Sequence, residues 1–473
     1  GAGLRQVFEE HYALNDSVLS AGFVSGDASR MRRILQKLAR NASVIVEVFG
    51  GSFTRGAGCG ETKTHADSAC CWSERSANWW RHAFPGRPLY WENRAQSGVS
   101  SEFVLGGIGA VVNGWHEAPD LIFVASSVND AAPLWKTSAL LGLEGLIRAL
   151  RSLLPGTQVI LVEDGCKDCV LMAPRRRELA RHYDVPVVDY AAVVQGHNRA
   201  GPGGPDRFWP WMDPVLAPSR PGGPGTFTVL GTEWPNFVPK VEVTKVTCCP
   251  ENHPPWVVHQ YYADIVSASL LRMLRDSCSE GAAGEPGPPP PMPAPVGPKE
   301  ELDRMSGCLW PLTMYDARGS SASDGIEATG GWSLAEDVPG RPGWISTKVG
   351  STLSFRVRFG RSDRALLSLG YLRSYEGVGA AAVEAWSVAS NGSATSRPGR
   401  KKELQALWAE RVSLPATFLA FEGWDPPIRE IQSSAAKAAL LAKRRRGQDA
   451  TYEAVVKFTH TSGPKFKVLS VIT

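Results

Sequence analysis

The sequence lacks three features that would each point to a class of protein. No apolar run approaches the roughly 20 residues that cross a bilayer, and the longest apolar strings, at residues 44–49 and 121–125, have the length of strands. The net charge is only +4, from 51 basic and 47 acidic residues, so no surface that tracks nucleic acid is indicated. Cys166-x-x-Cys169 has no second pair at zinc-finger spacing. We expect no membrane span in this chain, no nucleic-acid partner, no metal and no cofactor.

The composition is that of a folded protein rich in loops. Hydrophobic residues make up 43% and charged residues 21% of the 473 residues, which excludes disorder over the whole chain. The 48 glycines and 35 prolines exceed average usage and indicate long loops, linkers or insertions. The length is enough for several domains, and the patterns below favour two.

The cysteines indicate an oxidising compartment. Most of the nine lie in clusters or bracket a loop, which favours disulfides, although reactive thiols and metal ligands are alternatives. Three Asn-x-Ser sequons, at Asn15, Asn41 and Asn391, are compatible with a glycoprotein. We expect a protein that is secreted or in the secretory-pathway lumen, with its targeting segment absent from this sequence. The cysteines are Cys59, Cys70, Cys71, Cys166, Cys169, Cys248, Cys249, Cys278 and Cys308.

Residues 44–276 alternate short apolar strands with helical stretches, which predicts a doubly wound parallel sheet of the flavodoxin-like α/β class. Helices are expected at 138–154, where Leu and Ile recur at helical spacing before Pro155, at 175–182 and at 256–275. The strands are expected at residues 44–48, 89–91, 121–124, 159–162 and 186–188.

The second half of the chain has a different texture. Residues 195–250 are rich in Gly, Pro and Trp and are interpreted as an insertion near a site. We predict an α/β domain at residues 1–280 and a Pro-rich, semi-rigid spacer at 281–300. Residues 301–473 show short alternating segments punctuated by Gly, Asn and Pro, which predicts a smaller antiparallel β-sandwich. A basic run at 443–446 is interpreted as solvated.

Four residues stand around the ends of successive strands, where an open α/β sheet places its site. Two glycines precede Ser52 and allow a tight turn that exposes its hydroxyl. Gly98 could offer a backbone N–H, and Asn129 a side-chain amide, to an oxyanion. His253 precedes the last helix of the domain and could act as a base. Each also has a structural alternative, in which Ser52 and Asn129 serve only their own turns and His253 caps the helix or binds Glu251.

These ordered Ser, Gly, Asn and His blocks resemble the SGNH (GDSL-type) hydrolase family over roughly residues 44–275. The resemblance implies that Ser52 is the nucleophile and that His253 is the general base. It also implies that the N–H of Ser52, Gly98 and Asn129 form the oxyanion hole. Val128-Asn129-Asp130 and His253-Pro254 are its more specific parts.

Two positions depart from the family pattern. Gly51 replaces the usual Asp outside the reacting set, and Pro250 occupies the position of the acid partner three residues before His253. Losing that carboxylate removes support for the imidazole. Glu251 is the nearest substitute and is assigned to the catalytic set, while a Ser–His dyad and a backbone carbonyl partner are alternatives.

We therefore hold two hypotheses for function. The first is a serine esterase that acts on an ester such as an acylated glycan, through an acyl-enzyme on Ser52. The second is a catalytically impaired SGNH-fold protein that serves as a binding or structural subunit of an assembly whose partners are unknown.

Several aromatic residues are candidates for binding a sugar or an acyl chain, or for ordinary packing. In the first domain, Trp209, Trp211, Trp234 and Trp256 are assigned to substrate binding, whereas His259 is expected to be a packed histidine. In the second domain, the segments at 331–334, 342–345 and 369–372 are similar to aromatic strand ends of jelly-roll carbohydrate-binding modules. Such tryptophans are at least as often sandwich core.

Overall fold

The computed structural model covers the whole chain and describes the following residues: 16–57, 59, 71–113, 115–131, 138–193, 227–229, 232–234, 253, 256–279, 291–299, 301–302, 314–317, 325–337, 342–359, 367–374, 376–388, 401–407, 414–419 and 452–472.

Contacts divide the chain into two compact units. The first comprises Gly1–Ser101 with His116–Val296, and the second comprises Glu102–Trp115 with Gly297–Thr473. The main boundary falls within the segment predicted as a linker. The grouping of residues 102–115 with the second unit has no counterpart in the sequence analysis.

The α/β unit is built on a six-stranded sheet with the order β1-β6-β5-β4-β2-β3. All neighbours are parallel except β1, which pairs antiparallel with β6. The five parallel strands have the flavodoxin-like order, so the predicted fold class is confirmed. The strands are β1 (Phe23–Val24), β2 (Val44–Gly50), β3 (Leu89–Asn93), β4 (Leu121–Ala125), β5 (Gln158–Glu163) and β6 (Val187–Asp189).

Burial explains which strands were visible in the sequence. Every residue of β4 and β5 is buried, as expected for central parallel strands that are covered on both faces. Edge strand β3 alternates in exposure, and Tyr90 on it is 73% exposed. β1 was not predicted, because two residues carry no periodic pattern.

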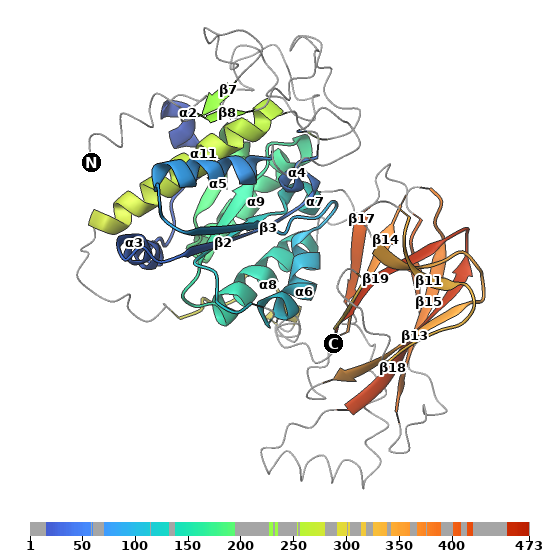
Figure 1. Cartoon of the computed structure of the whole chain (residues 1–473). Helices are drawn as coiled ribbons and strands as arrows, with labels where there is room; N and C mark the ends of the chain where they lie inside the picture. Colours follow the sequence, from blue (N-terminus) through green and yellow to red (C-terminus); the bar gives the residue numbers. More distant parts are fainter. Residues whose placement is uncertain are drawn as a thin grey trace, which may run out of the picture. The chain divides into compact units, whose positions relative to one another are not determined.

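Helices cover the sheet on both sides. In Figure 1, α3, α5 and α11 lie on one side and α8 on the other. The helices of this part of the chain are α2 (Asp16–Ala21), α3 (Met31–Ala39), α4 (Ser52–Arg55), α5 (Trp72–Ala83), α6 (Ser101–Asn113), α7 (Ser127–Asp130), α8 (Ser138–Leu153), α9 (Lys167–His182) and α11 (Trp256–Ser279).

The predicted helices exist, with one corrected start. α8 agrees with its prediction within one residue, and α11 extends four residues further than expected. α9 begins at Lys167 rather than at Arg175 and runs through Pro174. The residues before Arg175 give little helical signal in the sequence, because proline disrupts a helix interior. Cys166 provides the earlier start, since its Sγ caps the helix by accepting from Cys169 N.

The end of the predicted linker is bound to the α/β unit rather than extended away from it. Arg148 donates to Pro293 O at 2.8 Å, and Val296 N donates to Glu144 Oε1 at 2.7 Å. His182 Nε2 lies 2.7 Å from Ala294 O. α8 and α9 therefore hold residues 293–296 in place.

The insertion at 195–250 is described only at a two-stranded hairpin, β7 (Phe227–Val229) and β8 (Thr232–Trp234). Trp209 and Trp211 lie outside the described residues, and so do the side chains of Trp234 and Trp256. The binding role assigned to these four residues stays a prediction.

The second unit contains the predicted antiparallel β-sandwich. One sheet has the order β10-β13-β18-β15-β16 and the other β11-β12-β19-β14-β17, with β9 also paired to β19. The basic run at 443–446 lies outside the described residues. The strands are β9 (Met314–Asp316), β10 (Ile326–Ala328), β11 (Trp332–Glu336), β12 (Pro342–Ser346), β13 (Thr352–Phe359), β14 (Ser368–Arg373), β15 (Ala380–Ser387), β16 (Lys402–Gln405), β17 (Leu414–Leu419), β18 (Tyr452–Ser462) and β19 (Phe466–Ile472).

The aromatic residues that resembled a carbohydrate-binding platform are core residues instead. Trp332, Trp344 and Tyr371 are all at least 90% buried. Trp344 packs edge-on against Phe355 at 5.0 Å, and Tyr371 stacks on Phe466 at 5.8 Å. Their hydrophobic surface stabilises the sandwich and is not available to a ligand.

Cysteine chemistry agrees with the expectation of disulfides. Cys166 and Cys169 are bonded to each other, and Cys59 is also disulfide-bonded. Burial raises the pKa of the Cys71 thiol to about 11. The exposed Cys278 also keeps its thiol.

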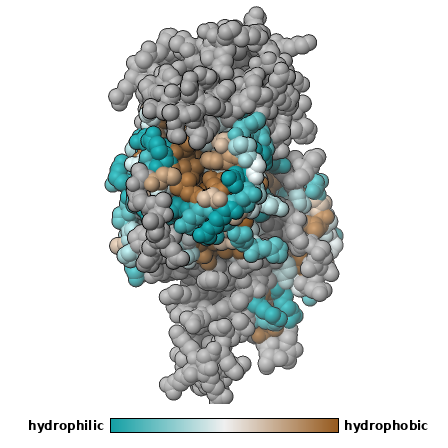
Figure 2. Space-filling view, turned by 60° about the vertical axis from the view of Figure 1, so that its left-hand side comes forward, coloured by the Kyte–Doolittle hydropathy of each residue, from teal (hydrophilic) through white to brown (hydrophobic). Residues whose placement is uncertain are grey.

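In Figure 2, hydrophobic residues gather in one area of the displayed face and are bordered by hydrophilic ones. Among the described helices, none has the length and apolar character needed to cross a bilayer.

Phe123 tests the packing of the α/β core. It is fully buried on β4, with its ring 6.0 Å from Trp72 and 5.8 Å from Trp91. Phe123→Ala is expected to lower the unfolding free energy of this unit by about 3–5 kcal/mol through lost burial and a cavity. Guanidinium unfolding followed by far-UV circular dichroism measures the change. Tyr90→Ala on the exposed edge should change it by less than about 0.5 kcal/mol, and equal effects would contradict the packing.

Candidate active site

The predicted site residues gather where the strand order reverses. β2 pairs with both β3 and β4, so the loops after these three strands meet at one edge of the sheet. Ser52 follows β2, Gly98 follows β3 and Asn129 follows β4. Open α/β sheets bind ligands at such a switch point, outside the carboxyl ends of the strands.

The turn that carries Ser52 leaves no room for side chains at the two preceding positions. A Cβ on Gly50 would lie 2.5 Å from Thr54 Oγ1 and 2.7 Å from Ala125 O. A Cβ on Gly51 would lie 2.0 Å from Asn129 Nδ2. A side chain at position 51, such as the Asp usual in the SGNH family, would therefore require Asn129 to move from the position it has here.

Ser52 and His253 are in hydrogen-bond contact. His253 Nε2 lies 2.7 Å from Ser52 Oγ, although the two residues are 201 positions apart in the chain. Ser52 begins α4, and His253 is half-buried three residues before α11 begins. This distance allows the imidazole to take the hydroxyl proton.

The acid partner of His253 lies in a part of the chain that is not described. Pro250 and Glu251 are both outside the described residues. The catalytic assignment of Glu251 therefore stays a prediction.

Asn129 reaches across to the loop that carries Gly98. Its Nδ2 donates to Val99 O at 2.9 Å, and the side chain is buried. Gly98 has φ +79°, a left-handed conformation that favours glycine and explains this residue type. An amide NH₂ carries two hydrogens, so one N–H of Asn129 remains for a second acceptor. The side chain thus joins two loops of the site rather than only its own turn.

His259 is a packed histidine, as expected. It is fully buried, and its Nδ1 accepts from Trp72 N at 3.2 Å. Its ring packs on Phe53, the residue after Ser52, with centroids 4.3 Å apart. Burial and the nearby Arg75 hold the pKa of His259 well below its usual value, so the imidazole is neutral.

Asn93 links the same loops and was missed by the sequence analysis. Its Nδ2 donates to Thr54 O at 2.8 Å, and its Oδ1 accepts from Ala95 N at 3.0 Å. It therefore joins the turn after Ser52 to the loop after β3. The signal available in the sequence was its place shortly after the predicted strand at 89–91, on the segment that leads to Gly98.

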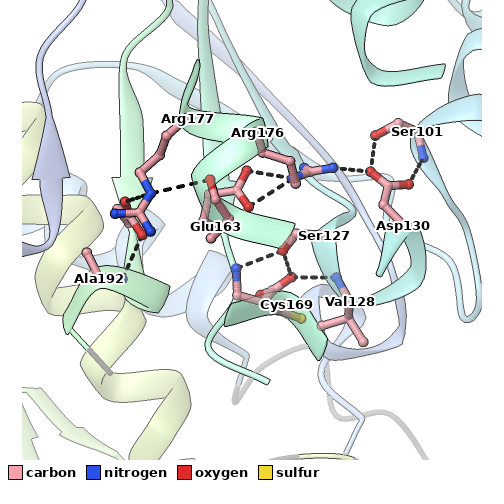
Figure 3. A network of polar contacts seen from close by, with 12 residues as sticks. Ser101, Ser127, Val128, Asp130, Glu163, Cys169, Arg176, Arg177 and Ala192 are labelled. Atoms are coloured by element: carbon pink, nitrogen blue, oxygen red, sulfur yellow. Dashed lines mark hydrogen bonds and ion pairs between the residues drawn. The ribbon is translucent and has the colours of Figure 1, made fainter. Parts of the chain in front are cut away.

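A buried network of acids and arginine lies behind the turn of Asn129 (Figure 3). Arg176 on α9 pairs with Glu163 at 2.8 Å and also with Asp130. Asp130 in turn accepts from Ser101 N and Ser101 Oγ, both at 2.7 Å. The network fixes Asp130, the residue that follows Asn129. The hydrophobic pattern of the sequence gives no sign of this network.

Asp164 holds the other end of the same turn. Its Oδ2 accepts from Ser127 Oγ at 2.5 Å and from Val128 N at 3.1 Å. Its Oδ1 accepts from Tyr262 OH at 3.0 Å. Asp164 and the preceding Glu163 both have raised pKa values. Burial raises the pKa of Asp164 to about 6 against the hydrogen bonds that it accepts, and raises that of Glu163 to about 7 against the attraction of Arg176.

The comparisons with known proteins agree with this geometry. The model of the GDSL-like lipase/acylhydrolase family matches residues 48–214, a span that includes Ser52, Gly98 and Asn129 and ends before His253. Residues 48–214 of the α/β unit thus match the GDSL-like (SGNH-type) family, and the unit has the α/β fold expected from that resemblance. No curated protein sequence matches the chain.

Among solved structures, the chain is similar to a two-domain esterase (CEX) active on acetylated mannans. The identity is 17% and the TM-score 0.57, with 96% of this chain and 97% of that chain covered. A family two carbohydrate esterase from Clostridium thermocellum, in complex with cellohexaose, aligns at 15% identity with a TM-score of 0.29. It covers 49% of this chain and 65% of that chain. The likeness to CEX concerns the fold, and it extends over both units.

The raised pKa of Glu163 predicts a pH dependence of stability. Its folded value of about 7 exceeds the ordinary 4.5, so the folded state takes up a proton as the pH falls. This contribution therefore favours folding increasingly between pH 8 and pH 5. Relative to Glu163→Gln, the wild type should gain about 2–3 kcal/mol of unfolding free energy over that interval.

Urea unfolding at several pH values measures the difference. The comparison with the variant is needed because His259 has the opposite effect on the pH dependence of stability. His259 is neutral in the folded protein and takes up a proton on unfolding in acid, so it disfavours folding as the pH falls. Both proteins share this contribution, and it cancels in the difference. Parallel pH curves for the two proteins would contradict a raised pKa of Glu163.

Proposed function

We propose that the protein is a serine esterase that hydrolyses acyl esters on a glycan, with acetyl as the first candidate group, through an acyl-enzyme on Ser52. The observation that carries the proposal is the 2.7 Å contact of Ser52 Oγ with His253 Nε2, beside the amide of Asn129. This arrangement supports nucleophilic attack next to donors that can stabilise an oxyanion.

Acylation follows from these positions. Ser52 Oγ attacks the ester carbonyl carbon while its proton passes to His253 Nε2. The carbonyl oxygen becomes an oxyanion, which the N–H of Ser52, the N–H of Gly98 and Nδ2 of Asn129 stabilise. The sugar alkoxide takes the proton from His253 as the C–O bond breaks, which leaves the acyl group on Ser52.

Deacylation repeats the sequence with water. His253 takes a proton from a water molecule that attacks the acyl carbonyl, and the same donors stabilise the second oxyanion. Collapse of this intermediate returns the proton to Ser52 Oγ and releases the carboxylic acid. The Ser–His contact supplies both proton transfers, and a carboxylate such as Glu251 would orient the imidazole.

The choice of an acetylated glycan rests on the two-domain fold. CEX, whose fold matches over 96% of this chain, is active on acetylated mannans. An acetylated mannan is therefore the first polymer to test. We also propose an extracytoplasmic location and glycosylation, for which the disulfides and the exposed Asn41 sequon are the support.

Substitution of the two reacting residues tests the proposal. Ser52→Ala should reduce kcat on p-nitrophenyl acetate and on acetylated mannan by at least about 10³-fold. His253→Ala should reduce it by about 10²–10⁴-fold through loss of the base. Unchanged thermal transitions serve as the control for folding. Background rates that are equal in wild type and Ser52→Ala would instead favour the second hypothesis, a catalytically impaired protein that binds a partner or ligand. Pro250 at the position of the acid partner is the sequence feature that favours this alternative.

Gly51→Ala tests the contact between the nucleophile turn and Asn129. The added Cβ would lie 2.0 Å from Asn129 Nδ2, so the amide must move. We expect kcat to fall by about 10²-fold, near the effect of losing one oxyanion donor. Gly330→Ala is the matched control, because a Cβ there meets nothing within 4 Å. Equal kinetics for the two variants would refute the close contact.

A further inference from the structure

We propose that Asp164 is a positioning residue that sets the oxyanion-stabilising amide of Asn129 by holding the turn of α7 against Tyr262 of α11. The inference deepens the proposed esterase function and rests on it. Neither the order of the four blocks nor the family match identifies this residue.

The first step is the place of Asp164 in the fold. It follows β5 directly, and β5 is the parallel neighbour of β4. α7, which carries Asn129, starts two residues after β4 ends. The parallel sheet therefore sets the Asp164 carboxylate beside the start of α7, where the residue is 99% buried.

The second step is the number of bonds that the carboxylate makes to this turn. Oδ2 accepts from both Ser127 Oγ and Val128 N, the two residues before Asn129. Asp164 N donates back to Ser127 Oγ at 2.7 Å. Three hydrogen bonds thus hold the side chain of Ser127 and the backbone of Val128, and two of them use an ionisable acceptor in a buried setting.

The third step connects this turn to the nucleophile. Tyr262 OH donates to Asp164 and accepts from Gly165 N at 3.1 Å. The ring of Tyr262 packs edge-on against Phe53, with centroids 4.6 Å apart. One residue of α11 thus contacts both the Asp164 loop and the residue after Ser52. The spacing between Ser52 and the amide of Asn129 is therefore fixed by Tyr262 of α11 as well as by the close approach of Gly51 to Asn129.

The consequence is a kinetic one. An oxyanion donor stabilises the transition state only when it lies at hydrogen-bond distance from the position of the developing charge. A small rotation of α7 moves the Asn129 amide out of that position without touching the substrate or Ser52. Loss of Asp164 should therefore reduce kcat with little effect on KM.

The test is a double-mutant cycle between Asp164→Asn and Asn129→Ala. Asp164→Asn keeps the shape of the side chain but removes the anionic acceptor. Alone, it should lower kcat by about 10-fold or more and change KM by less than roughly twofold. In the Asn129→Ala background it should cost less than roughly twofold further, since its effect passes through that amide. A full additional loss of kcat in that background would overturn the proposal.

Asp189→Asn is the matched control for buried acids in general. Asp189 is also fully buried and is the last residue of the next strand, β6, where it accepts from Ala192 N and pairs with Arg177. This variant should lower the thermal transition and keep the wild-type kcat at temperatures below that transition. A fall in kcat equal to that of Asp164→Asn would show a general structural effect and overturn the assignment.

A crystal structure of Asp164→Asn decides the inference without turnover. The expected result is a rotated α7 turn and a broken hydrogen bond between Asn129 Nδ2 and Val99 O, and an unmoved Asn129 would overturn it. Failure of the proposed function has a different signature, because the wild type would then show no Ser52-dependent hydrolysis at all.

Discussion

The parallel pairing of β2 with both β3 and β4 is the constraint on which the site depends. It brings three loops from residues 50–130 to one sheet edge, where Ser52, Gly98 and Asn129 meet. The contact is close, because Gly51 has no room for a Cβ beside the amide of Asn129. His253 comes from far along the chain and reaches Ser52 only because α11 packs back onto the same unit. The chemistry is thus a product of the strand order.

The elements that could be predicted from sequence are those whose burial leaves a pattern. β4 and β5 are apolar runs buried on both faces, and α8 has leucines at helical spacing. α5 was missed because it buries Ser73, Arg75 and Ser76 among its tryptophans, and this mixture shows no apolar stripe. The aromatic strand ends of the sandwich were visible, but sequence cannot tell a core Trp344 from an exposed one.

The same distinction applies to the site. The order of Ser, Gly, Asn and His is local information, and it was sufficient to name the reacting groups. Asn93, Asp164 and Tyr262 instead act through hydrogen bonds to partners that lie 36 to 98 positions away in the chain. The partner of Asn93 is a backbone carbonyl, which has no signature in the sequence. In sequence, an acid after a strand looks like an ordinary solvated loop residue. Only the sheet geometry shows that Asp164 is buried against the turn of Asn129.

Burying these acids has a cost, and the cost indicates what they do. Glu163, Asp164 and Asp130 lie around a single Arg176, and burial raises the pKa of two of them. Apolar side chains of similar size would often stabilise such a core as well or better. What an apolar core cannot do is bind Ser127 Oγ, Val128 N and Ser101 N in fixed directions. The turn between β4 and Ala131 is therefore stabilised by directional bonds at both ends. A site that depends on the placement of one amide needs that constraint more than it needs additional stability.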